Sequence, residues 1–216
     1  MRISKGHPLA LAAIMFTLAA PVLAQGGTGG SSSSSTKNSA AGTVDLSAYP
    51  TPPLAESELK LLRQMSDGDI LGHLITVDSM EVATADSARR ILKSDDMLDY
   101  AKMMRSAHSV SLERNRSLAK ETSITPIQMF GGLRASHVAA SLDSVHLASD
   151  VQLDRHYIMS QVELHQHVLA ELETLQSTAQ NAALRERIAA TIPAVRDHLA
   201  RAHALAVHNG FEKKRG

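Results

Sequence analysis

The sequence predicts an all-α protein, an antiparallel four-helix bundle with a short extra helix in the connection between the second and third long helices. Aromatic residues are scarce, with three Tyr, three Phe and no Trp, and this favours helices over β-strands. Apolar residues recur at helical spacing along four segments, each long enough for a rod of roughly 40 Å. Because the links near Ser94 and at 178–180 are short, neighbouring helices are expected to run antiparallel.

Residues 1–24 are predicted to be a secretory signal peptide. Arg2 and Lys5 give a positive start, and the apolar run at 9–20 is shorter than the roughly 20 residues of a transmembrane helix. Small side chains at Val22 and Ala24 suit cleavage after Ala24. We therefore expect export to the periplasm and no membrane span after cleavage, with an uncleaved anchor as the alternative.

The composition limits which covalent modifications and which binding partners are expected. The chain contains no cysteine, which excludes disulfides and lipid attachment at a cysteine. Without Arg2 and Lys5, the basic residues number 20 against 22 acidic ones, a net charge of −2. With no basic patch, nucleic acid is not an expected partner, whereas another envelope protein is a possible one.

The first helices follow a flexible Gly/Ser/Pro-rich linker at 25–55. A short helix is predicted from a cap at Ser57 to about Met65. The first long helix is expected to begin after Ser66, in an approximate capping box, and to run to about Lys93. Ser94 is expected to cap the second, which runs to about Lys120.

The second half of the bundle is predicted in the same way. A short helix at 135–146 precedes a third long helix, which starts at Ser149-Asp150 and ends near Ser177. The fourth runs from about Asn181 to His208, with Gly210 in a terminating position. Pro193 lies inside it and predicts a kink or a local break. The bundle is thus expected at 56–209, with a tail at 210–216.

Each long helix carries an ionisable residue in its apolar stripe: Glu81, His108, His165 and His198. Such groups are rarely buried unless they are paired or bind a metal. One interpretation is a single transition-metal site, with zinc, copper, iron or manganese as the ion and zinc and copper favoured by affinity. The other is a structural hydrogen-bonded network in which Glu81 or Asp78 accepts from the histidines and fixes helix register.

Other polar residues are expected to be structural. Tyr157 should pack its ring in the core and satisfy its hydroxyl near a helix end. His167 and His203 lie off the stripes and are predicted on the flank or surface. Four further histidines are expected to be solvated: His73, His137, His146 and His156.

Four stretches, taken in order, resemble the DUF4142 family of exported bacterial proteins. They are DGDIL at 67–71 with Met80-Glu81, YAKMMRSAH at 100–108, LDRHYIMSQVELH at 153–165 and IPAVRDHLARA at 192–202. The resemblance covers about 66–206 and implies a ferritin-like four-helix bundle. Ala83 and Ala107 replace acidic residues of the family pattern, and Leu153 replaces its usual Phe. The two lost acids argue against a site with several carboxylates, and the family's biochemical role is largely unassigned.

No nucleophile–base arrangement and no phosphate-binding loop is visible in the sequence. We therefore expect a non-catalytic binding or envelope-maintenance module. The alternative is a transition-metal-binding protein, with or without a redox role, that has a mononuclear Glu/His site inside the bundle.

Overall fold

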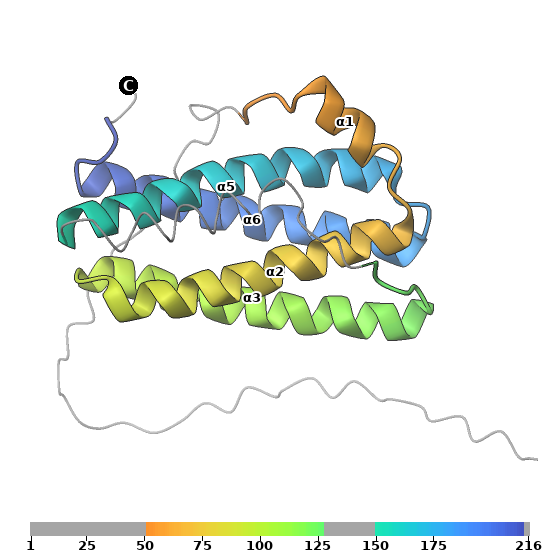
Figure 1. Ribbon diagram of the computed structural model, residues 1–216, viewed down its shortest axis with the longest axis horizontal. Coiled ribbons are helices and arrows are strands. Elements are labelled where there is room, and N and C mark those ends of the chain that lie inside the picture. Colours follow the sequence, from red (N-terminus) through yellow and green to blue (C-terminus); the bar gives the residue numbers. More distant parts are fainter. Residues whose placement is uncertain (1–50, 128–149, 214–216) are drawn as a thin grey trace, which may run out of the picture. The chain divides into compact units, whose positions relative to one another are not determined.

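The computed structural model describes residues 51–127 and 150–213, and these ranges are helical without strands. The helices are α1 (Glu56–Leu62), α2 (Asp67–Ile91), α3 (Asp95–Thr122), α5 (Asp150–Thr178) and α6 (Ala182–His208) (Figure 1). The prediction of an all-α helical bundle is confirmed. The expected leader at 1–24, the Gly/Ser tract and the helix at 135–146 lie outside the described residues.

The four long helices pack as two hairpins (Figure 1). α2 lies beside α3 and α5 beside α6, and each pair is joined by a link of three residues, so the partners run antiparallel. The hairpins meet where α3 contacts α6 and α2 contacts α5, and α1 packs on α5. Their shared core includes fully buried apolar side chains from all four: Leu71, Met97, Met104, Ile158, Leu172, Leu184 and Ile188.

Helix starts agree with the sequence where a side chain caps the first turn. The Ser66 hydroxyl accepts from the Asp69 amide at 3.2 Å, and the Asp69 carboxylate accepts from the Ser66 amide at 2.9 Å. Ser94 caps α3 as predicted, and Asn181, near which the fourth long helix was expected to begin, caps α6. The cap predicted at Ser57 is wrong: α1 begins at Glu56 without a side-chain cap and ends at Leu62, before Met65.

Pro193 does not interrupt α6, so the alternative of a local break is wrong. Proline removes one backbone donor from a helix. Ile192 and Val195 on either side of it are buried in the core, and this packing holds the backbone helical. The predicted end is confirmed, since Asn209 follows the helix and Gly210 has a φ of +71°.

Two contacts tie distant parts of the chain to the first turns of α2. The Asp67 carboxylate accepts from the backbone amides of Gln180 and Asn181 at 2.8 and 3.0 Å, which fixes the link between α5 and α6. The Ile127 amide donates to the Gly68 carbonyl at 2.9 Å. A Cβ at Gly72 would lie 1.9 Å from the Ile127 carbonyl oxygen, so glycine is required for this crossing.

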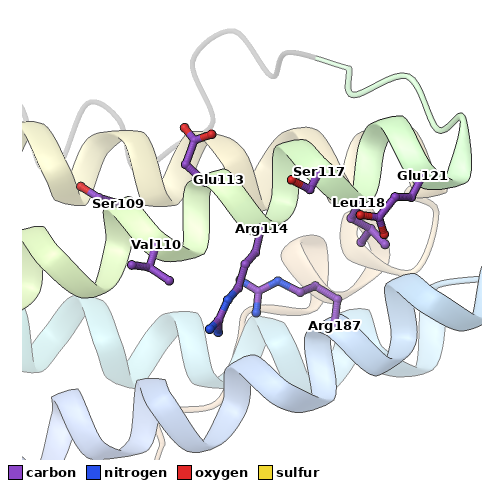
Figure 2. Close-up of a pocket in the computed structure, with 8 residues that line it drawn as sticks. All are labelled: Ser109, Val110, Glu113, Arg114, Ser117, Leu118, Glu121 and Arg187. Atoms are coloured by element: carbon purple, nitrogen blue, oxygen red, sulfur yellow. The ribbon is translucent and has the colours of Figure 1, made fainter. Parts of the chain in front are cut away.

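A surface pocket runs along the outer side of α3, from Ser109 to Glu121, and reaches Arg187 of α6. Figure 2 shows the Arg114 and Arg187 side chains extending toward each other between the two helices. The Arg187 guanidinium also takes part in the interior hydrogen-bond network described below. Within 51–127 and 150–213, no helix is both long and apolar enough to cross a membrane.

Replacing Gly72 with Ala should lower the free energy of unfolding by about 1–3 kcal/mol, because the new methyl group overlaps the Ile127 backbone. Urea unfolding measures this directly. Gly68→Ala is the matched comparison and should cost less, since its Cβ would lie 2.7 Å from the Thr125 carbonyl oxygen. A Gly72→Ala protein as stable as the parent would contradict the close crossing.

Candidate metal centre

Three histidines from three helices meet in the interior of the bundle. His108 of α3, His165 of α5 and His198 of α6 each offer a ring nitrogen, and these nitrogens lie within 4.8 Å of one another. The ring centroids are 6.0, 5.3 and 5.5 Å apart. The residues are only 7%, 2% and 7% exposed. The described structure thus brings together three of the four residues proposed from the sequence.

Two of these rings have an acceptor at Nδ1. His108 Nδ1 lies 2.8 Å from Asp78 Oδ1, and His165 Nδ1 lies 2.8 Å from the Gln161 carbonyl oxygen. A carbonyl and a carboxylate only accept, so both Nδ1 atoms carry a proton, and in the neutral form of each ring the lone pair is at Nε2. His108 Nε2 is buried without a hydrogen-bond partner. Metal-binding histidines are typically oriented in this way.

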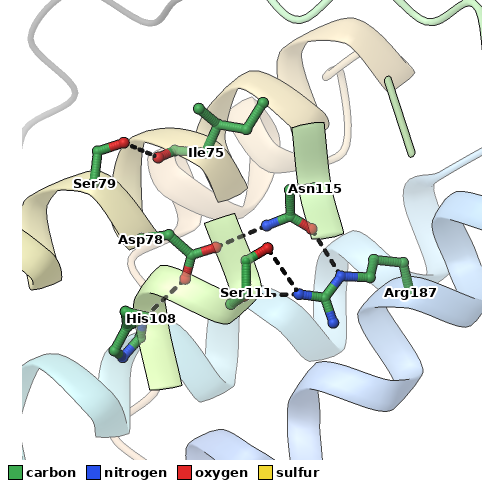
Figure 3. A network of polar contacts seen from close by, with 7 residues as sticks. All are labelled: Ile75, Asp78, Ser79, His108, Ser111, Asn115 and Arg187. Carbon is green, nitrogen blue, oxygen red and sulfur yellow. Dashed lines mark hydrogen bonds and ion pairs between the residues drawn. The ribbon is translucent and has the colours of Figure 1, made fainter. Parts of the chain in front are cut away.

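The acceptor for His108 is itself held by a chain of side chains (Figure 3). Asn115 Nδ2 donates to Asp78 Oδ2 at 2.8 Å, and Asn115 Oδ1 accepts from the Arg187 guanidinium at 2.8 Å. Arg187 also donates to the Ser111 hydroxyl at 2.7 Å. The sequence pointed to Asp78 but not to Asn115 or Arg187. For Asn115 the signal was its spacing after His108 and Ser111 along one face of α3. The spacing along α3 carries no signal for Arg187.

Glu81 is buried near His108 but does not belong to the set of ligand atoms within 4.8 Å. Burial is the largest influence on its pKa and raises it; His108 and the Gln161 side chain oppose that shift, and Asp78 adds to it. Neither carboxyl oxygen of Glu81 makes a hydrogen bond of ordinary geometry. Glu81 is therefore a neighbour of His108, and its carboxyl group is buried without well-formed hydrogen bonds.

Two more buried polar atoms lie on the same helix as His165. The Tyr157 hydroxyl and Gln161 Oε1 have no hydrogen-bond partner. The Tyr157 ring packs in the core against Tyr100, as predicted, with centroids 6.2 Å apart, but the expected satisfaction of its hydroxyl is wrong. Burial and the nearby Glu81 raise the pKa of Tyr157, which keeps the phenol protonated. The interior thus gathers polar groups that lack protein partners.

The histidine group is electrostatically suited to a cation when its imidazoles are neutral. Burial lowers the pKa of His165 well below its usual value, with further lowering by His108 and His198. Burial lowers the pKa of His198 to about 4, and His108 contributes to that shift. Both rings are therefore neutral at pH 7.

The other histidines divide between confirmed and wrong predictions. His156 is exposed, and His167 lies half-buried on the flank of α5, both as expected. His203 is 1% exposed, because the chain after α6 turns back and places Glu212 Oε2 2.9 Å from its Nδ1. His73 is not simply solvated, since its Nε2 lies 3.3 Å from Glu171. His137 and His146 lie outside the described residues.

The fold and site together define a helical-bundle protein with a polar, histidine-lined interior. The family model for the domain of unknown function DUF4142 matches residues 51–205. The chain belongs to this family, whose description assigns no biochemical role. No curated protein and no solved structure matches the chain. The chemistry of the interior must therefore be argued from its own residues.

The metal-free protein should lose stability as the pH falls below about 6.5. Unfolded His165 and His198 take up protons near pH 6.5, whereas their lowered folded pKa values keep them neutral, down to about pH 4 for His198. Each histidine lowers the free energy of unfolding by at most about 1.4 kcal/mol per pH unit. Thermal unfolding with a chelator, from pH 7.5 to 4.5, measures the trend.

Glu81 has the opposite effect on the pH dependence of stability. Because its pKa is raised in the folded protein, Glu81 stabilises the fold at low pH, and this stabilisation is lost as the pH rises through the folded pKa. Glu81→Gln removes that opposition and should make the acid-side loss steeper. His198→Asn should make it shallower by one proton, and exposed His156→Asn should leave it unchanged. A melting temperature that is constant between pH 7 and 5 would show that the histidines are not buried in the neutral form.

Proposed function

We propose that this protein is an exported, periplasmic helical bundle that binds one transition-metal ion through His108, His165 and His198. The observation that carries the proposal is the convergence of three buried imidazole nitrogens within 4.8 Å. Support for export comes from the leader pattern, in which Arg2 and Lys5 precede a short apolar run.

The donor set favours particular ions. Neutral imidazoles suit zinc, copper, iron and manganese, and affinity favours zinc and copper among these. Zinc takes imidazole nitrogens at about 2.0–2.1 Å, so the rings would rotate slightly inward on binding. Glu81 is the adjacent carboxyl group. An ion would lower its cost of ionisation in the interior, and Glu81 would then supply the fourth donor.

A second candidate function needs no metal. The bonds among Asp78, Asn115, Arg187 and Ser111 already join α2, α3 and α6. On this hypothesis the polar interior fixes the register of the helices, and the protein is a non-catalytic binding or envelope-maintenance module. It predicts a melting temperature that chelators do not change.

Elemental mass spectrometry of untagged protein from a periplasmic preparation should find an equivalent of metal that His108→Ala and His165→Ala each remove. Metal at 100 times its dissociation constant should add about 2.7 kcal/mol to the free energy of unfolding in the parent. His156→Ala, an exposed histidine on the same helix as His165, is the control and should retain both effects. Parent protein that neither contains nor takes up these metals would leave the structural network as the function.

Asp78→Asn tests whether the network orients the site. The amide nearly preserves the volume of the side chain but removes the negative charge that holds His108 Nδ1–H. Loss of such a supporting acceptor typically weakens metal binding by about 10–100-fold. Competition with a chromophoric chelator measures the affinity. Asp86→Asn, a partly exposed acid on the same helix, should bind as the parent does, and equal affinities in all three proteins would contradict the orienting role.

A further inference from the structure

A second cluster of metal-ligand side chains lies where α1 meets α5. Glu58 of α1 and His167 and Glu171 of α5 place one ligand atom each within 4.8 Å of the others. His167 Nε2 lies 2.7 Å from Glu58 Oε1 and 3.4 Å from Glu171 Oε1. His73 of α2 approaches the other oxygen of Glu171, with its Nε2 at 3.3 Å. Three helices thus meet around one buried carboxylate.

This cluster is separate from the three-histidine group. His167 is two residues after His165, and two residues correspond to about 200° around a helix, so the two rings leave α5 in nearly opposite directions. The side chains of Glu58 and His167 are 21% and 14% exposed, whereas that of Glu171 is 5% exposed. An ion from solvent can therefore reach the cluster without opening the core.

α1 depends on this contact more than the long helices do. It has only seven residues, and helices shorter than about 12–15 residues are marginal in water by themselves. Its apolar anchoring is small, since Leu62 is buried and Leu59 is half-buried, while Leu61 is 49% exposed. The polar cluster around Glu58 is consequently a main attachment of α1 to the bundle.

We propose that this cluster is a zinc site that fastens α1 to α5. Glu58, His167 and Glu171 are the ligands, and His73 positions Glu171 through its second oxygen. One imidazole and two carboxylates are a normal zinc donor set with an open fourth position for water. Two donors bound to zinc at about 2.0–2.1 Å in a tetrahedron are about 3.4 Å apart. His167 Nε2 and Glu171 Oε1 are already separated by 3.4 Å.

Zinc binding at this site would decide how firmly α1 is attached to the bundle. With zinc bound, α1 is cross-linked to the bundle through Glu58. Without zinc this cross-link is absent, and α1 is held by its apolar contacts and by polar contacts such as the 2.7 Å approach of Glu58 to His167. Zinc withdrawal therefore raises the fraction of molecules in which α1 is released from α5.

Zinc affinity and α1 protection test the proposal together in untagged protein. Competition with a chromophoric chelator should show at least about tenfold weaker binding at this site in Glu58→Gln and His167→Asn, and about 10–100-fold weaker binding in His73→Gln. Hydrogen exchange of residues 56–62 should slow on zinc addition in the parent and not in Glu58→Gln. Glu56→Gln changes another, exposed glutamate of α1 and should behave as the parent does.

Two results would overturn the proposal: exchange in α1 that is the same with and without zinc, or Glu58→Gln binding zinc as the parent does. Far-UV circular dichroism checks that each variant remains helical. The same measurements in His108→Ala separate the two sites, because zinc should still protect α1 when the three-histidine group is broken. The α1 site therefore stands or falls independently of the proposed function.

Discussion

The buried carboxylate of Asp78 is the interaction on which the interior of the bundle depends. A carboxylate inside a protein is costly unless hydrogen bonds or opposite charge surround it. Here His108 and Asn115, both on α3, bind its two oxygens, and Arg187 reaches Asn115 from α6. These bonds can form together only in one register of α2 against α3. The same bonds hold the His108 imidazole, whose lone pair in the neutral form is at Nε2.

The sequence predicted those features of the fold that depend on neighbouring residues. A serine or asparagine before an apolar-periodic segment caps a helix by a contact three residues away, so the starts of α2, α3 and α6 were correct. α1 lacks such a cap, and its start was misplaced. Pro193 shows the limit of local reasoning, because buried neighbours outweigh the lost backbone donor.

The site was predictable to the extent that burial follows helical periodicity. His108, His165 and His198 each occupy the apolar stripe of their helix, so their convergence followed once the helices formed a bundle. Periodicity cannot show which side chains meet across helices, and this is why the role of Arg187 was missed. It also cannot foresee that a chain end folds back over a helix, as at His203.

The three-histidine group is divided between the two hairpins, since His108 belongs to α2–α3 and the other two belong to α5–α6. Contacts within a hairpin are close in sequence and form quickly, whereas docking the hairpins must close the long connection from α3 to α5. We therefore expect the group to assemble in a late step of folding. Interactions that form after the rate-limiting barrier slow unfolding and leave the folding rate almost unchanged. An ion held there would lengthen the lifetime of the native protein without hastening its formation.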